Sequence, residues 1–428
     1  MVLLANGMKG LPYRKILFNT FTQFGSKSLS VLLSLVSVGL LTRYLNTDQY
    51  GWYTLVFTYI SFFTVLSDIG FNQTIVREFA QNEEQSKAAY ATLFNLKLIL
   101  IVISAVLSTI GLVFFPYPMT LKVGILIGVA AVAISNLSSY GTSILQAKLK
   151  LDYVAYLDIL TKVVTVIAIA IFVATKQNFY FIVGAVAIGN VIGLVPTLLL
   201  VKKQLVFRWT LDRVLVSKIV KISLPVGITA FLSILYFKID TMMLSLMRSP
   251  TDVGIYGLAY KVLENILLLW SLYMANVFPL LSRFHGKGQA DNFRNLVSKT
   301  LILLVTLSVV VIISGTTFSY LIMRILGGSK FFSSMVPFKI LLFAVPFLFL
   351  NNIFYNIIVS FGKTKYLIQP LVISLIVNFL LNLYAIPRYG YIGASYITVA
   401  TEMITSITYV IILFTKFKSE ASYLGLRV

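Results

Sequence analysis

Five lysines lie inside long apolar stretches of the chain, and this position makes them the strongest candidates for a chemical role. A charged side chain in hydrocarbon costs about 3 kcal/mol or more unless it is paired or hydrated, so by default it faces a partner or a water-filled cavity. Ammonium groups that line a cavity at that depth would bind an anion. We therefore predict that four of the five contact a negatively charged substrate, namely Lys27, Lys238, Lys261 and Lys97.

Pairing along a single helix competes with that hypothesis. Asp158 and the fifth lysine, Lys162, are four residues apart, and Lys261 and Glu264 are three residues apart. These spacings place both members of a pair on one helix face, where their charges can neutralise each other. The sequence leaves open whether the two pairs serve the substrate or only each other.

Two of the lysines have no such partner on their own helix. No acidic residue lies within one turn of Lys27, which falls about 18 Å along its span from the end nearer the N-terminus. Lys238 and Asp240 are two residues apart and therefore point to different helix faces. Both lysines need a partner on another helix or a hydrated cavity.

An acidic residue with neutral oxygen donors suggests a second site. Asp240, Asn382 and Thr398 are all expected at a similar depth, near the ends of their spans farther from the N-terminus. One carboxylate with an amide and a hydroxyl would suit Na⁺ or a proton, and no other metal or cofactor is expected. The alternative is that Asp240 only balances a neighbouring lysine. Glu402 has no partner within its own span, and its role stays open.

The elements that position these residues are membrane-spanning helices. Hydrophobic residues make up 58% of the chain and charged residues 11%, with a mean hydropathy of +0.92. Apolar runs of about 20 residues recur between short polar turns, which is the pattern of spanning helices. Twelve spans are expected, in two sets of six on either side of the basic stretch that begins at Lys202. Bends are expected at Pro225 with Gly227 and at Pro346.

The basic residues of the turns predict the orientation. Of the 35 lysines and arginines, 22 fall on the side of the N-terminus, eight on the opposite side, and five are the lysines within spans. This bias places both termini in the cytoplasm of a multi-pass protein of the cell (inner) membrane. Scattered basic residues without a stacking platform argue against nucleic acid as a partner.

The two halves of the chain repeat with an offset of 203 residues. This offset relates Gly254-Ile255-Tyr256 to Gly51-Trp52-Tyr53 and Lys218 to Lys15. An internal repeat is the signature of many transporters. The expected divisions are a tail (1–14), an N-terminal lobe (15–205), a linker (206–216), a C-terminal lobe (217–415) and a second tail (416–428).

Three motifs in order resemble a known family. They are RYLNTDQYGWYTLVFTYI with LSDIGFNQTIVREFA (43–80), YFKIDTMML with DVGIYGLAYK and FPLLSR (236–283), and IPRYGYIGASYITVATE (386–402). Together they resemble the polysaccharide-exporting flippases (Wzx type) of the multidrug/oligosaccharidyl-lipid/polysaccharide superfamily. The resemblance implies an all-α fold of two six-helix lobes related by a pseudo-twofold axis, with alternating access. It also implies cation binding in the second lobe.

The resemblance further implies a substrate, a polyprenyl-pyrophosphate-linked oligosaccharide moved from the cytoplasmic to the outer leaflet. Membrane lipid and the glycan assembly machinery are the expected partners, and the protein is expected to be a monomer. A cation-coupled drug exporter of the same superfamily is the first alternative, but its cavity should be acidic or aromatic. A membrane polysaccharide polymerase or acyltransferase is the second, and the sequence contains no paired carboxylates or HxxxD motif that would favour it.

Overall fold

The computed structural model describes residues 13–81, 87–205, 208–417, 420 and 423, and it describes the side chains from residue 25 onward, except those of 80 and 81. Most of the predicted tails, 1–14 and 416–428, lies outside the described residues, as do positions 206 and 207 of the predicted linker. Every regular element within these ranges is helical. The prediction of an all-α polytopic membrane protein is confirmed.

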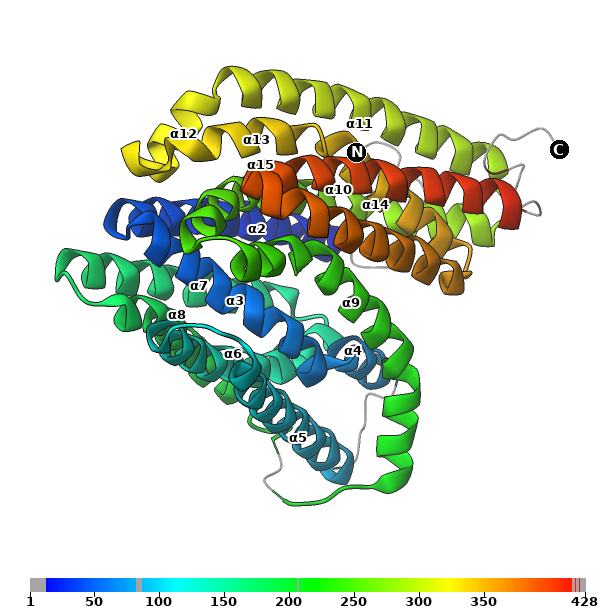
Figure 1. Cartoon of the computed structure of the whole chain (residues 1–428). Helices are drawn as coiled ribbons and strands as arrows, with labels where there is room; N and C mark the ends of the chain where they lie inside the picture. Colours follow the sequence, from blue (N-terminus) through cyan, green and yellow to red (C-terminus); the bar gives the residue numbers. More distant parts are fainter. Residues whose placement is uncertain (1–12, 82–86, 206–207, 418–419, 421–422, 424–428) are drawn as a thin grey trace.

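The N-terminal lobe and the C-terminal lobe follow each other along the chain. In Figure 1, helices α5 to α8 form one group and helices α11 to α15 form a second, with α2, α3, α10 and the second half of α9 between them. The N-terminal lobe contains α2 (Tyr13–Tyr44), α3 (Thr47–Asp68), α4 (Phe71–Gln81), α5 (Lys87–Gly111), the short η1 (Leu112–Phe114), α6 (Met119–Ala147), α7 (Leu151–Ala174) and α8 (Phe179–Leu200). The C-terminal lobe contains α9 (Arg213–Met247), α10 (Pro250–Gly286), α11 (Ala290–Thr317), α12 (Ser319–Gly327), η2 (Ser329–Ser334), α13 (Met335–Leu342), α14 (Val345–Ser360), η3 (Thr364–Leu367) and α15 (Ile368–Lys416).

Ten helical stretches of the described chain are long and apolar enough to cross a membrane, and the bent pair formed by η2–α13 and α14 makes an eleventh. The longest helix, α15, reverses direction at Gly390, whose φ of 55° and ψ of −138° lie outside the helical region. Its two halves then run antiparallel, because Ser374 bonds Thr405 across them at 2.6 Å. Dividing α15 at Gly390 gives the twelve spans that the sequence predicts.

Two of the predicted bends have different outcomes. The pair η2–α13 and α14 is bent by 47°, and Pro346 occupies the first turn after the break, as expected. Helix α9 continues through Pro225, so the proline does not end the helix, and the bend expected at Pro225 and Gly227 stays a prediction. In a membrane bundle, neighbouring helices can satisfy the backbone groups that a proline frees.

Polar caps start the helices that meet between the lobes. The Asn46 side chain accepts a hydrogen bond from the Gln49 backbone and forms a capping box at the start of α3. The Ser249 side chain accepts from the Asp252 backbone, and Pro250 occupies the first position of α10. The same kind of turn therefore starts both helices of the predicted repeat.

The two repeats meet where α3 crosses α10. A Cβ atom on Gly51 would lie 2.0 Å from the Pro250 carbonyl oxygen, and one on Gly254 would lie 2.3 Å from the Thr47 carbonyl oxygen. The offset of 203 residues relates Thr47 to Pro250 and Gly51 to Gly254, so exchanging the two repeats turns one contact into the other. This reciprocity is what a pseudo-twofold axis between α3 and α10 requires. The glycines allow the two backbones to approach closely.

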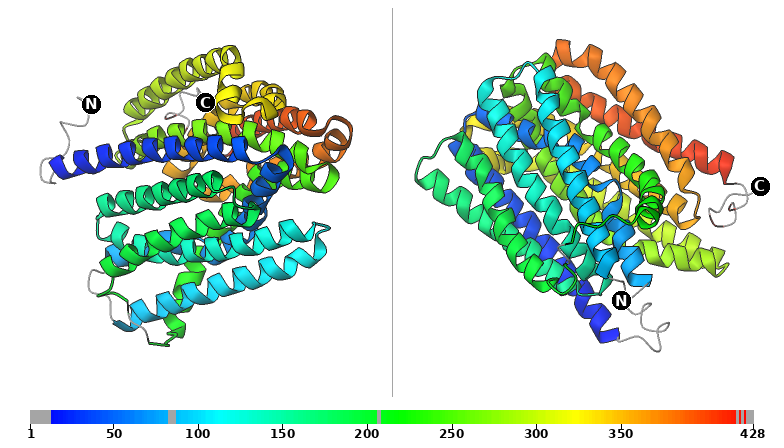
Figure 2. Two further views of the ribbon diagram at one scale, coloured as in Figure 1. Left: turned by 90° about the vertical axis from the view of Figure 1, so that its left-hand side faces the viewer. Right: turned by 90° about the horizontal axis from the view of Figure 1, so that it is seen from below.

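The lobes touch at both ends of the bundle. The start of α2 and the end of α15 lie at one end, here called the terminal end, and the opposite end is called the distal end (Figure 2). At the distal end, Thr42 of α2 donates to the Leu326 carbonyl of α12. Toward the terminal end, Glu78 of α4 pairs with Lys218 of α9 at 2.8 Å. These contacts leave a cavity between the lobes.

Candidate functional site

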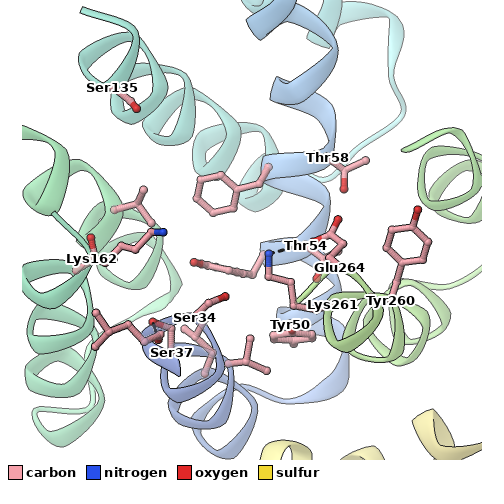
Figure 3. Close-up of a pocket in the computed structure, with 18 of the residues that line it drawn as sticks. Ser34, Ser37, Tyr50, Thr54, Thr58, Ser135, Lys162, Tyr260, Lys261 and Glu264 are labelled. Atoms are coloured by element: carbon pink, nitrogen blue, oxygen red, sulfur yellow. Dashed lines mark hydrogen bonds and ion pairs between the residues drawn. The ribbon is translucent and has the colours of Figure 1, made fainter. Parts of the chain in front are cut away.

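A cavity of about 510 Å³ lies between the two lobes. Helices α2, α3, α6, α7 and α8 of the N-terminal lobe and α9 and α10 of the C-terminal lobe contribute to its wall. Figure 3 shows side chains from both lobes pointing into the same space. The charged residues that line it are Asp158, Lys162, Lys238, Lys261 and Glu264.

On the wall formed by the C-terminal lobe, one carboxylate binds two lysines. Glu264 of α10 accepts from Lys238 of α9 at 2.5 Å through one oxygen and from Lys261 at 3.0 Å through the other. The Lys238 ammonium also lies 5.7 Å from the centre of the Tyr260 ring. We call Lys238, Lys261 and Glu264 the C-lobe lysine cluster. The predicted Lys261–Glu264 pair forms, and Lys238 finds its partner on another helix, as expected.

The N-terminal lobe repeats this arrangement with other residues. Asp158 of α7 lies 3.3 Å from the Lys162 ammonium and 3.8 Å from the Lys27 ammonium of α2. Ser30 donates to the same carboxylate oxygen at 2.8 Å. We call Lys27, Asp158 and Lys162 the N-lobe lysine cluster. Lys27 is 53% exposed and is not among the residues that line the cavity, whereas its two partners are.

The charge of the cavity follows from this sharing. In each cluster two ammonium groups face one carboxylate, so one positive charge remains in each lobe. Carboxylates hold their lysines in place, which lowers the cost of keeping a charge at this depth. Of the five charged residues that line the cavity, three are lysines and two are acids, so its wall carries one excess positive charge, and Lys27, outside the lining at 3.8 Å from Asp158, adds a second nearby.

Lys97 has a different environment from the other predicted lysines. Its side chain is fully buried, donates to the Ser67 carbonyl at 2.9 Å, and lies 3.6 Å from the Asp68 carboxylate. It also lies 5.6 Å from the centre of the Phe71 ring. It is not among the residues that line the cavity, and these contacts hold α5 against the end of α3. Among the described residues, Lys97 is the basic partner of Asp68.

The neutral part of the cavity wall combines hydroxyl groups with aromatic rings. Ser34 and Thr58 contribute hydroxyl groups, and Tyr53 and Phe57 contribute rings whose centres are 5.1 Å apart. Hydroxyls can bond to hydroxyls, and rings can cover the apolar faces of a ligand. These groups are suited to a polar ligand with some apolar surface.

The three residues of the predicted ion site do meet. Asn382 donates to one oxygen of Asp240 at 2.8 Å, and Thr398 donates to the other at 2.8 Å. All three side chains are buried, and the second amide atom of Asn382, its Oδ1, has no hydrogen-bond partner. Tyr256 completes the group by donating to Asp240 at 3.1 Å. We call these four residues the Asp240 cluster.

Tyr256 was missed in the sequence, although a signal for it was present. Asp240 lies eight residues before Arg248, which caps the end of α9, and Tyr256 lies eight residues after it. Residues at equal distances from the turn of a helical hairpin lie at the same depth. Tyrosine in this chain is abundant, so only this symmetry distinguishes Tyr256 from the other tyrosines.

These features define a class of protein: a multi-pass membrane transporter built from two six-helix lobes around a central cavity. A model of the family described as polysaccharide biosynthesis protein matches residues 16–285, and the chain belongs to that family. The MatE family model also matches residues 225–384. Both matches lie within the superfamily that the three sequence motifs resemble.

Solved structures of that superfamily share the fold over almost the whole chain. The lipid II flippase MurJ in an inward closed conformation aligns with 96% of this chain and 90% of its own, with a TM-score of 0.73 and 16% identity. The Vibrio cholerae MATE transporter VcmN aligns with 96% of this chain and 98% of its own, with a TM-score of 0.68 and 15% identity. A Pyrococcus furiosus transporter of the superfamily, described by a reverse polarity of its binding pocket, aligns with 96% of this chain and 97% of its own. The TM-score is 0.67 and the identity 14%.

Among curated proteins, an uncharacterized membrane protein of Methanocaldococcus jannaschii is 29% identical over 136 residues. The match covers 32% of this chain and 27% of that protein, so it spans only about a quarter of the relative. The structural likenesses, at these low identities, establish the fold alone.

Proposed function

We propose that this protein is a flippase that moves a polyprenyl-pyrophosphate-linked oligosaccharide between membrane leaflets by alternating access. The observation that carries the proposal is the excess of lysines at one cavity, whose lining holds three lysines and two acids, with Lys27 beside Asp158 as a fourth lysine outside the lining. A pyrophosphate that links a lipid to a sugar carries about two negative charges at neutral pH, because both of its phosphates are ionised. One excess positive charge on the cavity wall and a second at Lys27, 3.8 Å from Asp158, are suited to such a dianion.

The cavity wall suits the rest of such a headgroup. Hydroxyl groups from Ser34 and Thr58 are placed to bond sugar hydroxyls, and the rings of Tyr53 and Phe57 can cover the apolar face of a sugar. Membership in a family described as polysaccharide biosynthesis protein supports the same substrate class. The polyprenyl chain would stay in the bilayer, since hydrocarbon gains nothing from entering a charged cavity.

Drug export is the second candidate function, because the MatE model matches residues 225–384. Organic cations are the substrates that we expect of such an exporter. An excess of ammonium groups repels such substrates, so the charge of the cavity favours the anionic lipid-linked sugar. A polymerase or acyltransferase would need a positioned acid–base pair, and the family match supports transport instead.

We also propose that the Asp240 cluster binds the coupling cation, Na⁺ or a proton. Asp240 contributes two carboxylate oxygens, Thr398 a hydroxyl oxygen, and Asn382 an amide oxygen that has no hydrogen-bond partner. Hard oxygen donors of this kind suit Na⁺. The bound cation would neutralise a buried carboxylate that no basic residue of the described chain pairs with.

The proposed orientation follows the basic turns. Both termini would face the cytoplasm of the cell (inner) membrane, and the substrate would enter from that side and leave toward the outer leaflet. The glycan assembly machinery would supply the substrate, and a single chain already contains both lobes of the cavity, as expected for a monomer.

A transport assay tests the proposal. Proteoliposomes carry a fluorescent polyprenyl-pyrophosphoryl disaccharide, and an external quencher reports how much of it reaches the opposite leaflet. The variant Lys238→Ala/Lys261→Ala should reduce the initial rate at least tenfold, whereas Lys299→Ala, which removes an exposed lysine of α11, should not. Equal rates in the double variant and the wild type would refute a cationic substrate site. Imposed Na⁺ or proton gradients in the same liposomes identify the coupling ion.

A further inference from the structure

The buried acidic residues of this protein differ in whether a basic residue faces them. In the part of the chain that the structure describes, the buried ones are Glu78, Asp240, Glu402 and Glu420. Glu78 pairs with Lys218 and Glu420 pairs with Lys363. Asp240 and Glu402 form no ion pair with any residue that the structure describes, although basic residues outnumber acidic ones 35 to 14 in the chain. An unpaired carboxylate in a spanning helix is costly, so it is retained for a purpose.

Glu402 lies near the middle of the second half of α15 and is surrounded by neutral donors. Its side chain is 3% exposed, and the Asn351 amide of α14 donates to its carboxylate at 2.8 Å and to its backbone carbonyl at 3.1 Å. Ser406 fixes that amide by donating to its oxygen at 2.7 Å. The Tyr236 hydroxyl of α9 also faces the carboxylate. These groups form a rigid pocket of donors around one carboxyl group.

The Tyr236 hydroxyl can serve Glu402 in both of its protonation states. It has one proton and two acceptors in reach, the Glu402 carboxylate and the Thr405 hydroxyl at 3.3 Å. When Glu402 is ionised, Tyr236 can donate to it. When Glu402 carries a proton, that proton can bond the Tyr236 oxygen while Tyr236 donates to Thr405. Both states therefore keep their hydrogen bonds, which a purely structural acid would not require.

A polar row connects this pocket with the Asp240 cluster. Asn382 donates to the Asn378 oxygen at 3.0 Å, and Asn378 approaches Thr401 at 3.5 Å across the two halves of α15. The ionisable groups that face Glu402 from the surrounding helices are Tyr236 of α9, Tyr260 of α10, Tyr409 of α15 and, through the row, Asp240. None of them is a base that would hold Glu402 permanently ionised.

We propose that Glu402 is a proton-binding site, separate from the Asp240 cluster, with Asn351 and Tyr236 holding its carboxyl group in both protonation states. A proton is the ligand that fits, because the pocket presents an amide N–H and a hydroxyl to the carboxylate and not the cage of oxygens that a metal ion needs. Proton binding at Glu402 does not depend on the flippase function, since it concerns the protein without substrate.

Infrared difference spectroscopy of the purified protein in liposomes, titrated from about pH 5 to 9 without substrate, tests the proposal. The Asp240→Asn variant removes the other unpaired buried carboxyl, and we expect it to retain one protonated-carboxyl band that titrates. Adding Glu402→Gln should abolish that band, whereas adding Glu78→Gln, which removes a lysine-paired acid, should leave it. A titrating band that survives Glu402→Gln would overturn the proposal.

A second measurement covers the case in which Glu402→Gln does not fold. The Asp240→Asn protein alone must show a titrating carboxyl band, and its absence would overturn the proposal without any change at Glu402. Tyr236→Phe keeps the ring and removes the hydroxyl that faces the carboxylate, so the midpoint of the band should move upward by about one pH unit. A midpoint that does not move would show that Tyr236 does not serve Glu402. If the wild-type protein fails to move the lipid-linked sugar but its carboxyl band titrates as expected, the result counts against the flippase function and not against proton binding at Glu402.

Discussion

Two substitutions in the C-lobe lysine cluster should change the affinity for an anionic headgroup in opposite directions. Lys238→Met removes one ammonium and reduces the cluster from an excess of one positive charge to none. Glu264→Gln removes the shared carboxylate and raises the excess to two. If the cluster binds the anionic headgroup, the first variant should bind the headgroup more weakly than the wild type, and the second should bind it more tightly.

The size of both effects can be worked out from the contacts. A hydrogen bond from an ammonium to a phosphate contributes about 1.5 to 3 kcal/mol, so Lys238→Met should weaken binding roughly 10- to 150-fold. In Glu264→Gln the two ammonium groups, which share one carboxylate at 2.5 and 3.0 Å, lose their counter-ion. Because both reach one carboxylate, they are at most about 8 Å apart, and at an effective dielectric constant of about 20 they repel by about 2 kcal/mol or more. A bound phosphate relieves that repulsion, which corresponds to about 30-fold tighter binding.

The same repulsion should appear as lost stability in the absence of substrate. Glu264→Gln should lower the free energy of unfolding by about 2 kcal/mol, and a saturating anion should restore most of it. Lys238→Met should change stability less, because Lys261 still pairs with Glu264 at 3.0 Å. Tighter binding combined with lower stability is not expected from a residue that only supports the fold.

Fluorescence anisotropy of a soluble prenyl-pyrophosphoryl disaccharide, with the protein in nanodiscs at a fixed salt concentration, measures the affinities. Lys299→Met is the matched control, since that lysine is exposed on α11 and should leave the affinity within twofold of the wild type. The reasoning is refuted if Lys238→Met and Glu264→Gln shift the affinity in the same direction, or if neither differs from the control.

Three further predictions concern other parts of the fold. Asp240→Asn should abolish the stabilisation of the folded protein by Na⁺, which is about 2.7 kcal/mol for a cation at 100 times its Kd. The measurement is the difference in thermal unfolding between NaCl and choline chloride, for the variant and the wild type. Gly51→Ala should destabilise the protein by about 3 kcal/mol because its Cβ would lie 2.0 Å from the Pro250 oxygen, whereas Gly25→Ala, with nothing within 4 Å, should be neutral or slightly stabilising in the same melting assay. Lys97→Met should cost about 2 kcal/mol of stability by leaving Asp68 unpaired, yet leave the headgroup affinity unchanged.

The repeat and the depth of the charged residues could be predicted from the sequence because both are properties of position along a helix. The offset that relates Gly51 to Gly254 requires only counting, and the structure places these two glycines against each other. Asp240, Asn382 and Thr398 can be grouped by their distance from the distal end of their spans. Depth is preserved when straight helices pack side by side, which is why that grouping succeeds.

Rotation about each helix axis could not be predicted, and it determines the pairing. Lys27 and Asp158 are 131 residues apart and meet only because α2 packs on α7 with those faces together. Lys97 also lies within a spanning helix, but it faces the interior of its own lobe. Apolar residues surround a spanning helix on all sides, so the sequence carries no amphipathic face from which its orientation could be read.

The proposed ion site and the proposed substrate site lie on opposite faces of one helical turn. Lys238 of α9 faces the cavity, and Asp240, two residues later, faces the core of the C-terminal lobe. A second connection runs through α10, where Tyr256 bonds Asp240 and stacks on Tyr260 at 5.5 Å, and the Tyr260 ring lies under the Lys238 ammonium. A cation that changed the position of Asp240 would therefore act on Lys238 through the backbone and through two stacked rings. Because coupling is reciprocal, an anion held by Lys238 would change the affinity of the Asp240 cluster by the same factor.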